Sequence, residues 1–246
     1  MVSKAFCCGK RDGGERTPLD FDGVYMNATV YVNGEKMGTH PYGYTPFSFD
    51  ITDKVKVGEE NVVAVKVDHK TPSSRWYSGS GIYRSVHLSV MDKVHVGLNG
   101  TKVETPDLKS DTKNVTTNIK TTVQNEGAEK ASVELTHNIF KKGTEESIES
   151  VTTQAQEVEA GKSQVIEATT KAKSSSLWSP ENPALYTVRT EVKVGGKVVD
   201  TYDTEFGFRY FEMTTDKGAY LNGEKIKLKG VCMEYEERRI RRSCYS

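Results

Sequence analysis

Hydrophobic and polar residues alternate with a period of two along most of this chain. In residues 27–40, NATVYVNGEKMGTH, the alternation places Val30 and Val32 on one face, and Asn33-Gly34 is typical of a tight turn. We therefore expect a β-hairpin there. The same pattern recurs in five more segments, residues 61–69, 83–91, 132–140, 185–206 and 219–231. No segment has the spacing of an amphipathic helix, so the pattern predicts an all-β protein.

The number and spacing of these strands favour two consecutive β-sandwiches. A chain of 246 residues is long enough for two domains, each with its own hydrophobic core. We place one boundary near Asp92 and a second near Gly207. Residues 1–18 have no periodic pattern and residues 234–246 form a charged block, and we expect both ends to be poorly ordered.

Composition excludes several classes of partner. Lys and Arg total 34, as do Asp and Glu, so the charge predicts neither nucleic-acid binding nor binding to an anionic membrane. No apolar run is long enough to cross a bilayer and no secretory signal precedes the strands, which predicts a cytoplasmic protein. The cysteines have no zinc or C-x-x-C spacing, and we interpret them as free thiols: Cys7, Cys8, Cys232 and Cys244.

The segment SSRWYSGSGIYRSV, residues 73–86, is the candidate binding loop. Arg75 offers a forked donor, Trp76 and Tyr77 offer aromatic faces, and the Gly79-Ser80-Gly81 run allows a tight turn. An aromatic face beside a bidentate polar group is typical of sugar sites. Alternatively, the two aromatic side chains simply cap the sandwich core.

The sequence gives little support for a metal site, a cofactor site or a pair of catalytic carboxylates. The histidines stand singly, without metal-ligand spacing: His40, His69, His87, His95 and His137. We therefore expect no metal and no cofactor. Glu234, Glu236 and Glu237 stand beside the basic run RRIRR near the C-terminus, and we interpret them as a solvated tail rather than as catalytic groups.

Four segments in order resemble glycoside hydrolase family 2, and most closely its β-galactosidases. They are SRWYSGSGIYR, LWSPENPALYTV, FGFRYFEM and LNGEKIKLKGV, and the resemblance covers about residues 21–233. It implies a partial jelly-roll sugar-binding domain at 19–92, an immunoglobulin-like sandwich at 93–207 and the start of a (β/α)8 barrel at 208–233. It also implies that the loop with Arg75, Trp76 and Tyr77 projects toward a β-galactoside pocket.

In this family both catalytic carboxylates come from later barrel strands, and a complete barrel needs about 250 residues. We therefore expect a non-catalytic N-terminal fragment, inactive alone, as a truncated or frameshifted gene would produce. Two alternatives remain. The chain is a carbohydrate-binding module that complements a barrel supplied by another chain, or it is a β-sandwich interaction protein.

Two structural expectations accompany this interpretation. A jelly roll without its opening strands would expose sheet edges, which predicts self-association. In the second sandwich we expect Trp178 to anchor the core, together with Leu185 and Tyr186 on the following strand.

Overall fold

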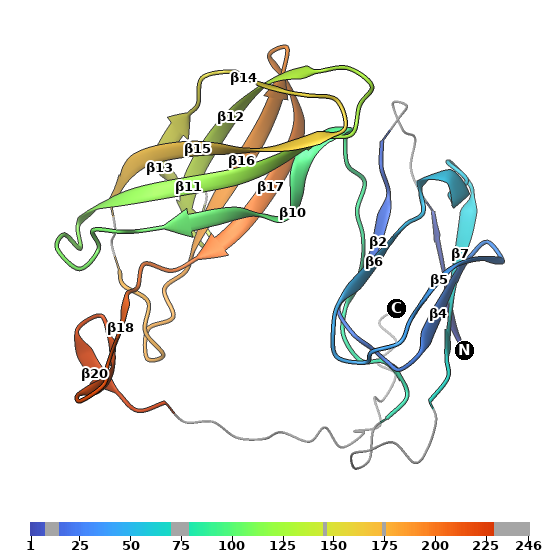
Figure 1. Ribbon diagram of the computed structural model, residues 1–246, viewed down its shortest axis with the longest axis horizontal. Helices are drawn as coiled ribbons and strands as arrows, with labels where there is room; N and C mark the ends of the chain where they lie inside the picture. The colour runs from blue at the N-terminus through green and yellow to red at the C-terminus, as the bar shows by residue number, and fades with distance from the viewer. Residues whose placement is uncertain (8–14, 70–78, 145–146, 174–175, 229–246) are drawn as a thin grey trace. The chain divides into compact units, whose positions relative to one another are not determined.

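The computed structural model describes residues 1–7, 15–69, 79–144, 147–173 and 176–228 (Figure 1). The chain divides into two compact units, with the division between Met91 and Asp92. In the described residues nearly all regular structure is β-strand, together with one short 3-10 turn at Thr52–Lys54. The fold is therefore all-β, as the alternation predicts. No helix among these residues is long and apolar enough to cross a membrane.

Two sheets and a short strand pair form the first unit. The larger sheet has the order β1-β7-β4-β5, with bounds Val2–Cys7, Glu60–Val67, Ala28–Val32 and Glu35–His40. The second has the order β6-β2-β9, with bounds Phe47–Asp50, Pro18–Phe21 and Val86–Leu88. β3 (Val24–Tyr25) pairs with β8 (Gly81–Ile82). All neighbouring strands are antiparallel.

The predicted hairpin of residues 27–40 is confirmed as β4 and β5. Val30 and Val32 point to one face and are fully buried. Asn33 and Gly34 have φ values of 51° and 84°, the left-handed conformations that a two-residue type I′ turn requires. Both sheets contribute to one core, made by Leu19, Phe21, Val24, Ala28, Val30, Val32, Ile51 and Val65.

The expectation that residues 1–18 lack regular structure is wrong for part of that segment. Val2–Cys7 forms the edge strand β1, in unbroken antiparallel register with β7. Its side chains are mostly exposed and only Phe6 packs against the core, so the strand carries no hydrophobic alternation. Cys7 is an exposed free thiol. Residues 8–14 lie outside the described part of the chain.

The second unit is a sandwich of a three-stranded and a five-stranded sheet. The first has the order β10-β11-β15, with bounds Val94–Glu104, Asn114–Asn125 and Lys162–Lys173. The second has the order β13-β12-β16-β17, with bounds Ser147–Thr152, Ala131–Lys141, Tyr186–Val194 and Lys197–Phe206, and β14 (Gln156–Val158) also pairs with β12. Figure 1 shows β11 and β15 side by side in one layer and β12 and β16 in the other.

Two separate hydrophobic clusters fill this sandwich. The first cluster is Val94, Val96, Val123, Ala131, Val133, Leu135, Val158, Ile166 and Val192. The second cluster is Leu108, Val115, Ile119, Ile139, Ala172, Tyr186, Val188 and Phe208. Each cluster takes residues from both sheets, so the inner faces of the two sheets pack against each other in both regions.

Tyr186, rather than Trp178, anchors the second cluster. Tyr186 is fully buried, and its ring packs edge-on against Phe208, with ring centroids 4.8 Å apart. Its hydroxyl accepts a hydrogen bond from the Ser176 backbone N–H, at 3.1 Å. Trp178 is only half-buried, and the guanidinium of Arg209 lies 4.5 Å from its ring centroid. The prediction for Trp178 is therefore wrong, because its indole ring supports a cation–π contact near the surface.

A small three-stranded sheet follows the sandwich, formed by β18 (Phe211–Thr214), β19 (Gly218–Leu221) and β20 (Glu224–Ile226). The Asn222 side chain fastens it to the sandwich, because its amide donates to the Trp178 carbonyl oxygen and its oxygen accepts from the Tyr210 N–H. Phe211 and Met213 are 50% and 73% exposed. The assignment of 208–233 to the start of a barrel stays a prediction.

Candidate functional site: an aromatic cluster at the base of the binding loop

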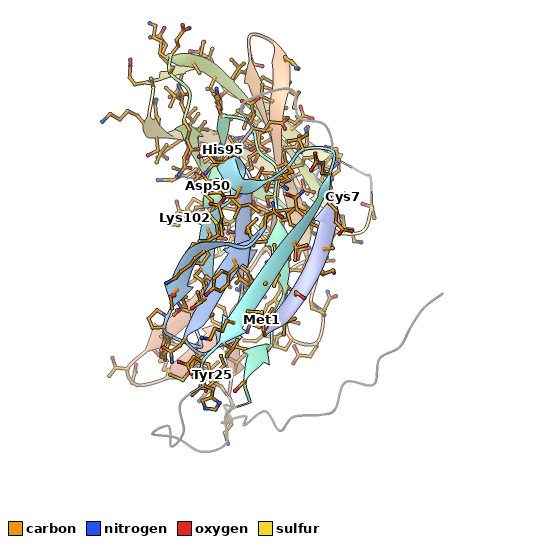
Figure 2. All side chains as sticks on the ribbon, turned by 90° about the vertical axis from the view of Figure 1, so that its right-hand side faces the viewer. Met1, Cys7, Tyr25, Asp50, His95 and Lys102 are labelled. Atoms are coloured by element: carbon orange, nitrogen blue, oxygen red, sulfur yellow. The ribbon has the colours of Figure 1, made fainter. Side chains whose placement is uncertain are left out.

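Arg75, Trp76 and Tyr77, the predicted site residues, lie outside the described residues. The structure does describe the two places where their loop leaves and rejoins the first unit. The chain leaves after the end of β7 at Val67 and returns at β8, which begins at Gly81. Figure 2 places Tyr25 at this end of the larger sheet and Cys7 at the other end.

A hydrogen bond joins the two sides of the loop base. His69 Nδ1 lies 2.7 Å from the Ser80 hydroxyl oxygen. The His69 ring also meets the Tyr25 ring edge-on, with centroids 5.3 Å apart and an interplanar angle of 89°. These contacts fix the orientation of His69, which therefore helps to hold the loop base together.

Three tyrosines continue outward from His69. Tyr25 contacts Tyr44 at a centroid distance of 5.3 Å, and Tyr44 contacts Tyr42 at 5.7 Å, both in edge-on geometry. Tyr42 and Tyr44 are 57% and 59% exposed. We call Tyr25, Tyr42, Tyr44 and His69 the aromatic cluster. Its outer two rings are large apolar surfaces open to solvent, each with a hydroxyl group at its tip.

Gly43 allows the two exposed tyrosines to take these positions. A Cβ atom at Gly43 would lie 2.2 Å from Cδ2 of the Tyr25 ring, so no larger residue fits without moving that ring. The Tyr83 hydroxyl donates a hydrogen bond of 2.8 Å to the Gly43 carbonyl oxygen. The segment between Tyr42 and Tyr44 is therefore held from both sides.

Hydrogen bonds from the side chain and the backbone of Asn27 hold the same end of the unit together. Its side-chain amide donates to the Asp68 carbonyl oxygen at 3.0 Å, and its backbone N–H donates to the Pro41 carbonyl oxygen at 3.2 Å. The Asp68 N–H in turn donates to the Met26 carbonyl oxygen. Three segments that are distant in sequence thus meet directly beneath the aromatic cluster.

The polar groups near the cluster suit a neutral, hydroxyl-rich ligand. The tyrosine hydroxyls both donate and accept hydrogen bonds, and the Arg84 guanidinium lies 5.6 Å from the Tyr83 ring centroid. Sugars present apolar C–H faces and hydroxyl edges, which match exposed aromatic rings with polar tips. Among the described residues, no three His, Cys, Asp or Glu side chains gather closely enough to hold a metal ion.

Three carboxyl groups in the described residues have pKa values below their usual range. At Asp50, burial opposes ionisation, but hydrogen bonds from Thr52 and Arg16 outweigh it and lower the pKa. The Lys102 ammonium group lowers the pKa of Glu104, and backbone N–H groups of Asn114 and Lys113 lower that of Asp111. These three carboxylates are therefore ionised at neutral pH, whereas the general acid of a glycosidase needs a raised pKa.

The sequence pattern did not identify the aromatic cluster. Tyr25, Tyr42 and His69 come from three separate segments, and each looks like an ordinary strand or turn residue by itself. The nearest signal was the Gly43-Tyr44 pair between two strands, because a glycine flanked by aromatic residues permits a close backbone approach.

Comparison with known proteins identifies both units. Residues 3–91 match the model for glycosyl hydrolases family 2, sugar binding domain, and residues 101–209 match the model for glycosyl hydrolases family 2. A β-galactosidase of Bacteroides ovatus is 41% identical over 234 residues, which are 95% of this chain and 27% of that protein. A β-glucuronidase of Formosa agariphila is 32% identical over 248 residues, covering 92% of this chain and 25% of that protein.

A solved structure agrees with these matches. The crystal structure of a glycosyl hydrolase family 2 member from Bacteroides cellulosilyticus is similar, with a TM-score of 0.84 and 32% identity, over 94% of this chain and 31% of that one. The chain thus spans about a quarter to a third of the length of these relatives. The chain belongs to glycosyl hydrolases family 2, and it contains the sugar binding domain of that family.

Proposed function

We propose that this chain is the non-catalytic, sugar-binding part of a family 2 β-galactosidase. The aromatic cluster is the observation that carries the proposal. Tyr42 and Tyr44 are exposed, yet Tyr25, Gly43 and Tyr83 fix their positions, so they form a preorganised stacking surface beside the loop. Together with Arg75, Trp76 and Tyr77 of that loop, they would contact the non-reducing sugar of a β-galactoside.

One observation favours a galactoside over a glucuronide. The β-galactosidase of Bacteroides ovatus shares more identical residues with this chain than the β-glucuronidase of Formosa agariphila does.

Docking on a catalytic barrel is the second candidate function. The β18–β20 sheet favours it, because Phe211 and Met213 are exposed on a sheet that Asn222 holds rigidly against the sandwich. A barrel would bury these side chains whether it belonged to the same polypeptide or to another chain. On this account the chain acts only when it is assembled with a barrel.

Calorimetric titration tests the proposed sugar site. We expect the purified chain to bind galactose and lactose saturably, and the exposed-residue variants Tyr42→Ala and Tyr44→Ala to lose that binding while remaining folded. Tyr220→Ala, at a half-buried tyrosine of the second unit, is the control and should bind normally. Equal binding of glucuronic acid would contradict the assignment to galactosides, and binding of neither sugar would contradict a sugar-binding role for the isolated chain.

A further inference from the structure

Four strands of the second unit each place one polar residue between the two hydrophobic clusters of the sandwich. We call these residues the polar belt: Thr101 on β10, Thr121 on β11, His137 on β12 and Thr190 on β16. Thr101 is the register partner of Thr121, and His137 is the register partner of Thr190. The belt therefore runs across both sheets at one level of the core.

The neighbours along each strand define this level. On β12, Leu135 belongs to the first cluster and Ile139 to the second, with His137 between them. The same order holds on β11, where Thr121 lies between Val123 and Ile119. On β16, Thr190 lies between Val192 and Val188 in the same way. The belt thus divides one continuous sandwich core into two apolar halves.

Three polar atoms of the belt are buried and have no hydrogen-bond partner among the described residues. They are the hydroxyl oxygens of Thr101 and Thr121 and the Nε2 atom of His137. The fourth member is satisfied, because the Thr190 hydroxyl lies 3.0 Å from His137 Nδ1. A buried polar group without a partner costs about 1–3 kcal/mol, so three at one level are unlike an ordinary core.

The chemistry of these atoms indicates which species would satisfy them. Hydroxyl groups donate and accept hydrogen bonds, and His137 Nε2 does one or the other depending on its tautomer. The belt contains no carboxylate and no ammonium group, so it attracts neither a cation nor an anion. A water molecule both donates and accepts, and buried waters in proteins typically make about three hydrogen bonds to such groups.

We propose that the polar belt holds at least one ordered water molecule, bound between His137 Nε2 and the Thr121 hydroxyl of the facing sheet. Facing sheets lie about 10 Å apart, and the imidazole extends further into that gap than a threonine side chain does. The two apolar clusters flank the belt and both Thr121 and His137 are fully buried, so a water bound between them is shielded from solvent.

Water-selective NOESY and ROESY spectra of the full chain, labelled at threonine methyl groups, test the proposal at neutral pH. We expect a cross peak of a long-lived water at the Thr121 methyl group. The Thr117 methyl group is the control, because Thr117 is equally buried on the same strand but its hydroxyl donates to the Val115 carbonyl oxygen. No water peak at Thr121, or an equal peak at Thr117 that reports only hydroxyl exchange, would overturn the proposal.

A pair of substitutions gives a second, independent test. If Thr121 binds water, Thr121→Val removes a hydrogen bond and lowers the folding equilibrium constant, by about 2- to 10-fold. If its hydroxyl has no partner, the same change removes an unsatisfied polar group, and the constant stays equal or rises. Thr117→Val serves as the reference for the loss of one buried hydrogen bond, because it removes the bond from the Thr117 hydroxyl to the Val115 carbonyl oxygen. A folding constant for Thr121→Val at or above that of the unsubstituted chain contradicts the bound water.

Discussion

The Tyr83 hydroxyl donates a 2.8 Å hydrogen bond to the backbone carbonyl oxygen of Gly43, and this bond links the strand after the binding loop to the segment that carries the exposed tyrosines. Tyr83→Phe removes the bond and keeps the ring. We expect a several-fold weaker affinity for galactose, because Tyr42 and Tyr44 lose their fixed positions, with a stability loss of about 0.5–1.5 kcal/mol. Calorimetry and urea unfolding measure the two effects. Unchanged affinity would show that the position of Gly43 does not matter for binding.

Gly43→Ala should disturb the aromatic cluster directly. The added Cβ would lie 2.2 Å from the Tyr25 ring, so that ring must move. Gly38→Ala is a matched control in the same unit, since its Cβ would meet the Phe49 ring at 2.3 Å, away from the cluster. We expect both variants to lose stability, and only Gly43→Ala to lose galactose affinity. Equal affinities for the two variants would argue against a sugar site at the cluster.

Stability of the second unit should fall in mild acid because of His137. Burial lowers the pKa of His137 from 6.5 to about 4, so the unfolded chain takes up a proton that the folded chain does not. The contribution of neutral His137 to the free energy of unfolding is fully present above pH 6.5. It is lost as the pH falls toward about 4, at up to about 1.4 kcal/mol per pH unit.

Urea unfolding between pH 7.5 and 4.5 measures this loss, and His137→Gln is the comparison. The substituted chain should show a flatter dependence of stability on pH over that range. The same slope in both proteins would assign the acid sensitivity to other groups.

Tyr186→Ala should destabilise the second unit more than Trp178→Ala does. The tyrosine is fully buried against Phe208, and its removal leaves a cavity that costs about 3–5 kcal/mol. The indole is half-buried, and its loss removes a cation–π contact with Arg209 worth about 1 kcal/mol together with part of its apolar burial. Thermal unfolding monitored by circular dichroism compares the stability of the two variants. A larger loss of stability for Trp178→Ala would show that Trp178, and not Tyr186, is the more important core residue.

The hairpins were predictable because their signals are local. Asn33-Gly34 and Gly195-Gly196 adopt the positive φ angles of tight turns, and the flanking alternation alone decides which side chains face the core. β1 was not predictable, because its position depends on backbone pairing with β7, far along the chain. An edge strand that buries only Phe6 needs no hydrophobic period of its own.

The candidate site could be predicted only in part for a similar reason. The loop around Trp76 is conspicuous because its aromatic and polar groups are consecutive in the sequence. Tyr25, Tyr44 and His69 become neighbours only after three segments meet through Asn27. Likewise, we expected Trp178 to anchor the core together with Leu185 and Tyr186, but only Tyr186 is fully buried, because it lies on the inner face of β16.

Hydrolysis of a chromogenic β-galactoside by the purified chain, beside an intact family 2 β-galactosidase, tests most directly whether the chain is non-catalytic. We predict no turnover above background for this chain, although it binds galactose through the aromatic cluster. Turnover that persists through purification and tracks the amount of this chain would contradict this prediction, because the chain would then contain a catalytic carboxylate pair of its own.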